Sequence, residues 1–164
     1  MDPRQSEQAA LDRLEAETSI RGLLGAACRE LVIVLDATAA AISRVIGDLL
    51  VGLDEHTVSG RPLAHGHEYL ISDFPLTREV VESGEVRWVS VSDEDAEPSE
   101  AELLEKLGFD SLLMVCLPAN GGCWGLVEVY AQDAHFGEQH AQVAARLAAR
   151  TGELLERLEP ADTR

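Results

Sequence analysis

The sequence predicts a single α+β domain that combines a mainly antiparallel sheet with a long helix near each end of the chain. Three observations support this prediction. Apolar residues near both ends recur at alternating spacings of three and four, which is typical of amphipathic helices. Two pairs of apolar segments are each joined by a tight-turn dipeptide, Gly47–Asp48 and Asn120–Gly121. The chain has 164 residues, which is enough for one core of this kind.

The first helix is predicted over residues 6–35. The stretch before Ile20 is more charged and less regular, so it is either an extension of the helix or a connecting segment. We assign residues 1–19 to an N-terminal helical extension and residues 20–159 to the domain itself. Residues 160–164 are expected to form a flexible tail. The apolar residues in the second half of the helix fall on one stripe: Ile20, Leu24, Ala27, Leu31 and Val34.

The next segments predict two strands, over residues 38–46 and 48–57, which are joined by the first tight turn. The loop that follows contains Gly60, Pro62 and Gly66, and a short extended piece is expected at Tyr69–Ile71. These elements predict one edge of the sheet.

A helix is then predicted from the segment SDFP. Ser72 or Asp73 can cap its first turn, and Pro75 suits the first helical position. Gly84 is expected to end this helix, after which a β-branched segment, residues 86–91, predicts another strand.

The remaining segments complete the predicted order. A helix is expected from Pro98 to Gly108, with Ser99 and Glu102 matching a capping box. The apolar run at residues 112–117 predicts a strand buried on both faces, and residues 123–131 form its hairpin partner. The last helix is predicted over residues 137–158, with its apolar stripe at Ala144, Leu147, Thr151, Leu154 and Leu158.

Composition excludes some classes of function. Thirteen basic residues against 30 acidic ones leave a formal net charge of −17. Such a charge argues against binding to nucleic acid, which depends on cationic contacts to phosphate, and against docking on an anionic membrane. No stretch is long and uncharged enough to predict a transmembrane helix. We therefore expect neither a nucleic-acid nor a membrane partner.

The three cysteines do not suggest a disulfide framework, because their number is small and odd. Cys28 and Cys116 lie in apolar runs and are expected to behave as small buried hydrophobic residues, whereas Cys123 follows the hairpin turn and is expected to be more exposed. This usage predicts a reducing, cytoplasmic location. The composition, rich in Ala and Arg and poor in Lys, suggests a bacterial source.

Two segments resemble the GAF domain family, and the resemblance extends from about Ile20 to Leu158. They are YLISDFPLTREVVESGEVRWVSVSDED and LLEKLGFDSLLMVCLPANGGCWGLVEVYAQDAHFGEQ. No single piece is specific, but the order and spacing match the family. The matching features are Phe74–Pro75, Val86–Val91, Asp93–Asp95, Leu107–Gly108, Ser111, Leu117–Pro118, Gly121–Gly125 and Phe136.

The resemblance implies a central antiparallel sheet of about six strands, with the terminal helices on one face and helices and loops enclosing a small-molecule pocket on the other. Domains of this family sense ligands or dimerise, and they regulate an attached or separate output domain. The segments that line or flank the cavity in similar domains contain these candidate ligand-binding residues: Tyr69, Phe74, Trp88, Phe109, Ser111 and Trp124. Ordinary core packing is the alternative for each of them.

The terminal helices predict a homodimer, because their apolar stripes can pack in a helix bundle with a second subunit as well as on the sheet. The residues expected at this interface are Leu24, Leu31, Leu147, Leu154 and Leu158. A dimerisation module without any ligand is therefore the main alternative to a sensor.

Several specific ligands fit the sequence poorly. The segment AQDAHFGEQ has the Phe and one acidic residue of the signature of cyclic-nucleotide-binding relatives but lacks its Asn-Lys pair. Covalent bilin attachment needs a Cys followed by His, and no cysteine here has that neighbour. Haem would need an axial ligand, for which the candidates by residue type are His56, His65, His67, His135 and His140.

Metal binding and catalysis are also weakly supported. His65 and His67 are two residues apart and could reach one ion from an extended segment, but two ligands on a Gly-containing loop are a weak signal, and no metal is predicted. The surrounding motifs of the GAF-like family that reduces methionine sulfoxide with cysteines are missing, as are common hydrolase and P-loop motifs. We predict no catalytic residues and leave the cofactor unassigned. The sequence thus favours a non-catalytic sensory or regulatory domain.

Overall fold

The computed structural model describes residues 3–63 and 68–159. The helices are α1 (Pro3–Glu15), α2 (Ile20–Leu35), α3 (Pro75–Ser83), α4 (Pro98–Leu107) and α5 (Glu138–Leu158), with a short 3₁₀ turn, η1 (Ile71–Asp73), before α3. The strands are β1 (Ala39–Ile46), β2 (Leu49–Thr57), β3 (Glu68–Leu70), β4 (Arg87–Ser90), β5 (Ser111–Ala119) and β6 (Gly122–Ala131).

The strands form one antiparallel sheet in the order β3-β2-β1-β6-β5-β4, which confirms the predicted fold class. Both predicted hairpins are present. The β1–β2 turn places Gly47 at φ 60°, and the β5–β6 turn places Asn120 at φ 56° and Gly121 at φ 80°. Glycine and asparagine are favoured at such left-handed positions, which is why these dipeptides identified the turns from sequence.

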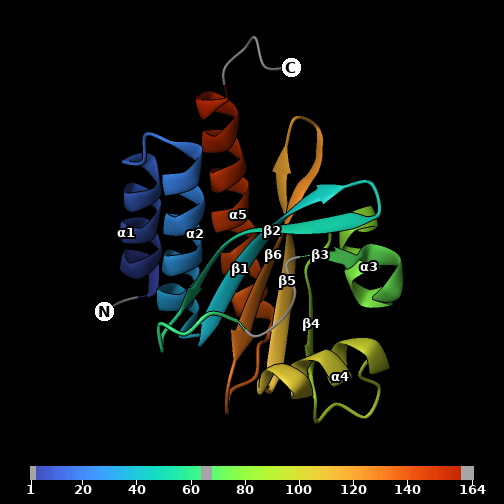
Figure 1. Cartoon of the computed structure of the whole chain (residues 1–164). Coiled ribbons are helices and arrows are strands. Elements are labelled where there is room, and N and C mark those ends of the chain that lie inside the picture. Colours follow the sequence, from blue (N-terminus) through green and yellow to red (C-terminus); the bar gives the residue numbers. More distant parts are fainter. Residues whose placement is uncertain (1–2, 64–67, 160–164) are drawn as a thin grey trace.

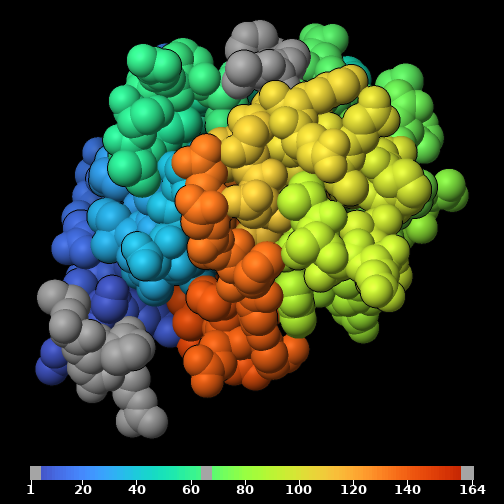
Figure 2. Space-filling view, turned by 90° about the horizontal axis from the view of Figure 1, so that it is seen from below, coloured from blue at the N-terminus to red at the C-terminus, as the bar shows by residue number. Residues whose placement is uncertain are grey.

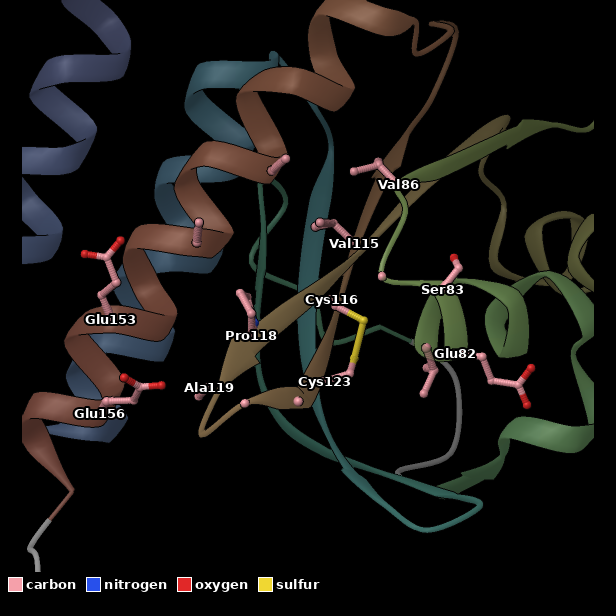
Figure 3. Close-up of a pocket in the computed structure, with 16 residues that line it drawn as sticks. Glu82, Ser83, Val86, Val115, Cys116, Pro118, Ala119, Cys123, Glu153 and Glu156 are labelled. Atoms are coloured by element: carbon pink, nitrogen blue, oxygen red, sulfur yellow. A yellow bond between two sulfur atoms is a disulfide. The ribbon is translucent and has the colours of Figure 1, made fainter.

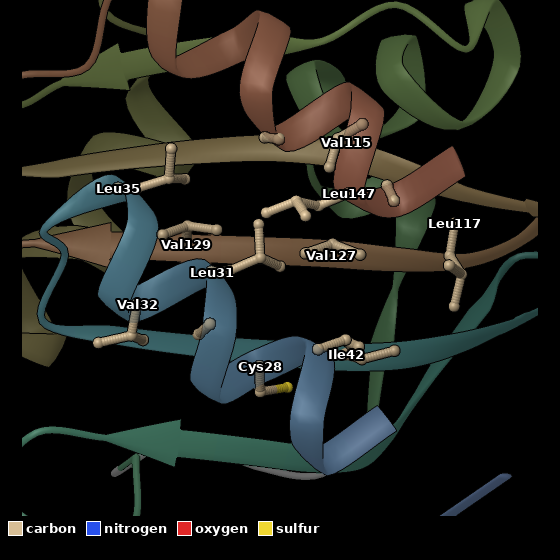
Figure 4. Packing of buried hydrophobic residues seen from close by; sticks show 14 of the residues in the cluster. Cys28, Leu31, Val32, Leu35, Ile42, Val115, Leu117, Val127, Val129 and Leu147 are labelled. Carbon is tan, nitrogen blue, oxygen red and sulfur yellow. The ribbon is translucent and has the colours of Figure 1, made fainter. Parts of the chain in front are cut away.

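The sheet separates two layers of helices (Figure 1). Helices α2 and α5 lie side by side on one face, with α1 outside them, whereas α3 and α4 lie on the opposite side. The first face carries the larger apolar cluster, in which Leu31 of α2 and Leu147 of α5 meet Val127 and Val129 of β6 (Figure 4). The second face carries a smaller cluster around Leu112. No helix in the described part of the chain is long and apolar enough to cross a membrane.

The prediction of one continuous helix over residues 6–35 is wrong. The chain leaves α1 after Glu15 and begins α2 at Ile20, where the Ser19 side chain accepts a hydrogen bond from the Gly22 N–H over 3.0 Å. Helix α1 packs against α2 and α5, which buries its residue Leu14. The free energy gained by burying the apolar side of α1 outweighs what one continuous helix would gain, because the first part of such a helix would project into water.

The beginning of α3 also differs from the prediction. Neither Ser72 nor Asp73 caps it, because both belong to η1, and Phe74 is the residue before the first helical residue, Pro75. Ser72 is engaged elsewhere, since its N–H and its hydroxyl donate to the two carboxylate oxygens of Asp48 over 2.9 and 2.6 Å. This contact anchors the beginning of α3 to the β1–β2 turn.

Helix α4 is capped two residues earlier than predicted. Its N-cap is Glu97, whose carboxylate accepts hydrogen bonds from the N–H groups of Ser99 and Glu100 over 3.2 and 3.0 Å. The expected box of Ser99 with Glu102 is therefore replaced, because the helix begins earlier, at Pro98, and the Glu97 side chain satisfies the unpaired donors of that first turn. Viewed from below, α4 and the chain that leads into it form a continuous surface beside the segment that follows β6 (Figure 2).

The leucines predicted to lie at a dimer interface are core residues of one chain. Four of them are at most 7% exposed, and the fifth is partly buried against the same apolar cluster. The apolar stripes of α2 and α5 pack on the sheet and on each other, and their contact with a second subunit stays a prediction. The residues concerned are Leu24, Leu31, Leu147, Leu154 and Leu158.

Candidate functional site

A polar cluster lies within the face of the sheet that α3 and α4 cover. Successive side chains of β6 alternate between the faces, so Val127 and Val129 join the cluster under α2 and α5, while Leu126 and Tyr130 join the other cluster. Glu128 has the same parity as Tyr130 and is buried. A carboxylate therefore occupies a position in a layer that is otherwise largely apolar.

Hydrogen bonds organise this cluster. The Tyr130 hydroxyl donates to Glu128 Oε2 over 2.9 Å. From the helices above, the Thr77 hydroxyl of α3 donates to Glu100 Oε1 of α4, and its oxygen lies 3.3 Å from the sulfur of Met114 in β5. Thr77 thus links both helices of this layer to β5, beside the Tyr130–Glu128 pair of β6.

Burial perturbs the acids of the cluster. It raises the pKa of Glu100 to about 7; the hydrogen bond from Thr77 opposes this rise and the nearby Glu128 carboxylate reinforces it. Burial likewise raises the pKa of Glu128, although its hydrogen bond with Tyr130 acts in the opposite direction. The pKa of Tyr69 is raised to about 12 by burial and by the charge of Glu128.

The two carboxylates differ in their partners from Glu30, another buried carboxylate, which pairs with Arg13 and Arg29. None of the ion pairs within the described residues includes Glu100 or Glu128. A buried carboxylate without a cationic partner is costly, and it either takes up a proton or receives a positive group from outside. Strongly perturbed acids of this kind mark candidate functional sites. The arrangement can hold a proton or bind a group that donates hydrogen bonds.

Three of the predicted ligand-binding residues lie on this side of the sheet. Tyr69 of β3 packs against the smaller apolar cluster and meets Phe74 in an edge-to-face contact with ring centroids 5.9 Å apart. Phe109 stacks on Tyr130 at 5.0 Å. Phe74 also lines a cavity of about 220 Å³ between the beginning of α3 and α4, together with Lys106.

The other three lie on the opposite face. Trp88 pairs with Leu113 and lines a surface groove with Ala141 of α5. Ser111 donates to the Ala134 carbonyl over 2.5 Å, and Trp124 packs against the α2–α5 cluster. The structure therefore does not bring the six predicted residues together.

Strand parity, together with one shift in strand register, is the physical reason for this separation. Trp124 has the parity of Leu126 and Tyr130, but it is the extra residue at the register shift of the β5–β6 ladder, between Cys123 and Gly125. It therefore packs on the α2–α5 side, where the Arg44 guanidinium lies 4.3 Å from the centre of its ring. Sequence reasoning missed Glu100 and Glu128, although an isolated Glu between apolar residues in a strand, as in the segment LVEVY, is a signal that could have found one of them.

The metal hypothesis cannot be placed in the fold, since His65 and His67 lie outside the described residues. Among the residues that are described, no group of three or more His, Cys, Asp or Glu side chains could hold an ion. His135 is engaged by the Ser90 hydroxyl, whose oxygen lies 2.9 Å from its Nδ1.

A second feature is an open groove of about 600 Å³ between the end of α3, the β5–β6 hairpin and α5 (Figure 3). Its lining includes Cys116 and Cys123, which form a disulfide with their Cα atoms 5.5 Å apart. Cys116 is buried, as expected, but the expectation that the three cysteines form no disulfide is wrong. The sequence separation of 7 concealed the pair, because its closeness depends on the pairing of β5 with β6.

The sequence pattern of the GAF domain family matches residues 19–155. No curated protein sequence matches the chain. Comparison with solved structures finds phytochrome domains.

Three of these structures illustrate the likeness. The chromophore-binding domain of a bacteriophytochrome from Stigmatella aurantiaca has a TM-score of 0.80 at 16% identity, covering 94% of this chain and 60% of that one. The corresponding domain of RpBphP3 from R. palustris has a TM-score of 0.82 at 15% identity, covering 97% and 63%. The phycoerythrobilin-bound GAF domain from a cyanobacterial phytochrome has a TM-score of 0.79 at 14% identity, covering 96% of both chains. The chain spans less than two thirds of the two chromophore-binding domains, and at these identities the likeness shows the fold.

Proposed function

The chain belongs to the GAF domain family, and from this premise we propose that it is a non-catalytic sensory domain that binds a small molecule between the sheet and the layer of α3 and α4. The observation that carries the proposal is the pair of buried carboxylates, Glu100 and Glu128, on that face. Neither has a cationic partner within the described chain, so a ligand can supply one.

The chemistry of the cluster favours a ligand with a protonated nitrogen or several N–H donors. Such a group would bind between the two carboxylates, and hydrogen bonds with the Tyr69 and Tyr130 hydroxyl groups would orient it. The apolar surroundings, which include Phe109, would bury the remainder of the ligand. The ligand would thus replace the proton that burial otherwise favours on Glu100.

Some of the phytochrome structures carry bilins, but a covalently attached bilin fits this chain less well. Cys116 and Cys123 are joined to each other, and Cys28 is buried under the opposite layer of helices. No described cysteine therefore offers a free thiol on the proposed ligand face. We include a bilin among the test compounds as the competing ligand class.

The proposal can be tested by native mass spectrometry of freshly purified protein and by thermal unfolding with a panel of amines, guanidines, purine bases and biliverdin. A ligand that binds the folded state raises the melting temperature. The expected result is a rise with a cationic compound that is lost in Glu128→Gln and kept in Glu94→Gln, which changes the exposed acidic loop. A response that is equal in both variants, or no response to any compound, would contradict the proposed site.

A dimerisation module is the competing function, and a homodimer is part of our proposal in either case. Since the predicted leucines are buried, a dimer would have to use the outer faces of the helices, where Ile33 of α2 is 54% exposed. Light scattering that gives the mass of one chain, 17.7 kDa, at all concentrations would refute this part. The bacterial source, the cytoplasmic location and the regulated output domain are likewise proposals.

A further inference from the structure

The disulfide between Cys116 and Cys123 lies where the β5–β6 hairpin changes its pairing. The register of the two strands shifts between Leu117 and Pro118, within the loop that the disulfide closes. At the other end of the hairpin the ladder is regular from Ser111 onward. The disulfide therefore holds the irregular end of an otherwise continuous pair of strands.

The two sulfur atoms differ in their accessibility. Cys123 is half-buried and Cys116 is 7% exposed, and both line the groove of about 600 Å³. The third cysteine, Cys28, is fully buried in the other apolar cluster, where burial raises the pKa of its thiol far above the usual range. Exchange chemistry requires an approachable sulfur, so the groove makes Cys123 the atom that can be attacked.

The clamped end of the hairpin contacts both layers of helices. The Sγ atom of Cys116 lies 3.3 Å from the carbonyl oxygen of Val80 in α3. On the other side, the Asn120 N–H donates to Glu156 of α5 over 2.6 Å, and the backbone oxygen of Pro118 meets Gly152 so closely that a side chain there would overlap it. A change at the disulfide would reach α3 and α5 together.

We propose that Cys116 and Cys123 form a reversible redox site, which exchanges with a small thiol bound in the groove and thereby alters how the β5–β6 hairpin holds α5. The site is separate from the proposed ligand site between the carboxylates, and its operation does not require that ligand.

The exchange proceeds in two steps. A thiolate R–S⁻ attacks Cys123 Sγ, a new S–S bond forms, and Cys116 leaves as a thiolate that takes a proton from solvent. A second thiolate then attacks the sulfur of R in the mixed disulfide, which releases R–S–S–R and the Cys123 thiolate, and this thiolate also takes a proton from solvent. The protein gains two electrons and two protons, and two molecules of thiol are oxidised to one disulfide.

The charge of the groove restricts the kind of thiol. Its described lining includes Glu82, Glu153 and Glu156 and no basic residue, although Arg78 and Arg150 pair with two of these glutamates from outside. A negative groove repels anionic thiols and concentrates cationic ones. The structure therefore favours a neutral or cationic thiol over an anionic one.

The first experiment measures the redox equilibrium of the full chain. Protein is equilibrated in buffers of reduced and oxidised dithiothreitol, the free thiols are alkylated under native conditions, and the mass is recorded. The expected result is a reversible gain of two alkyl groups, with Cys28 labelled only after unfolding. The proposal is overturned if the pair stays oxidised in every reducing buffer, or if it never closes in oxidising buffer.

The second experiment identifies the attacked sulfur and the preferred thiol. In Cys116→Ser, the remaining Cys123 should form a mixed disulfide with the disulfide of cysteamine, whereas Cys123→Ser should react far more slowly. In the native protein, cysteamine should reduce the bond about tenfold faster than mercaptoethanesulfonate at equal thiolate concentration and low salt. That ratio should fall toward one at high salt and in Glu153→Gln. Equal rates for the two thiols at low salt would refute the charge selection.

The third experiment tests the effect on α5 by hydrogen exchange of the oxidised and reduced forms. Reduction should lower the protection of residues 117–125 and of the last turns of α5, where Glu156 meets the hairpin, and leave α1 unchanged. Cys123→Ser should resemble the reduced form without any reductant. Unchanged protection of α5 on reduction would overturn the proposed coupling.

Discussion

Glu100→Gln should change the way in which the stability of the domain depends on pH. Glu100 is buried between α3, α4 and the sheet, where it faces Thr77, Glu97, Glu128 and Tyr130. Glutamine keeps an oxygen that can accept the hydrogen bond from Thr77, but it cannot ionise. The variant therefore imitates the protonated acid at every pH.

The sign and the size follow from the difference in pKa. In the unfolded chain the carboxyl ionises near 4.5, whereas in the fold it does so near 7, so its stabilising contribution is complete below pH 4.5 and is lost as the pH rises through 7. The rise in pKa corresponds to a loss of roughly 3 kcal/mol over this window. Glu128, whose pKa is also raised, adds a loss of the same sign in both proteins.

Urea unfolding between pH 4 and pH 8 measures the effect. The variant should match the native protein at the acid end and should exceed its free energy of unfolding by up to roughly 3 kcal/mol above pH 7. The control is Glu105→Gln, which removes an exposed carboxyl group from the same helix and should leave the pH profile unchanged. Parallel profiles for Glu100→Gln and the native protein would refute the reasoning.

Four further substitutions test the packing and the disulfide. Gly152→Ala would place its Cβ so close to the Pro118 backbone oxygen that the two overlap, and urea unfolding should show a loss of about 2 kcal/mol in the free energy of unfolding. The control is Gly25→Ala, whose Cβ would meet only the flexible Asp54 carboxylate and which should be neutral or stabilising. Similar effects of the two substitutions would contradict the close approach at Gly152. Leu147→Ala should cost about 2–5 kcal/mol in the same assay, because Leu147 is 1% exposed, and a cost below 1 kcal/mol would be inconsistent with its place in the core. Cys123→Ser, which cannot form the disulfide, should be about 2 kcal/mol less stable than the oxidised native protein, because the disulfide restricts the unfolded chain. It should be nearly as stable as the reduced native protein. An equal loss of stability against both forms would argue against this role of the disulfide.

Local signals, each contained within a few residues, predicted most of the elements and their order. Glycine and asparagine at left-handed turns identified both hairpins, and Gly84 and Gly108 ended α3 and α4 as predicted. Where two local signals competed, as at the beginning of α4, the longer reach of Glu97 decided against Ser99. The GAF resemblance rested on this order, and the family match over residues 19–155 confirmed it.

Which residues face one another depends on the tertiary structure alone. The face on which Trp124 lies depends on the register shift of the β5–β6 ladder, and the burial of Leu31 against the sheet depends on the packing of α2 beside α5. The nearness of Cys116 to Cys123 depends on strand register, and that of Glu100 to Glu128 on the docking of α4. These contacts join segments that are distant along the chain, and their free energy comes from burial that no local pattern records.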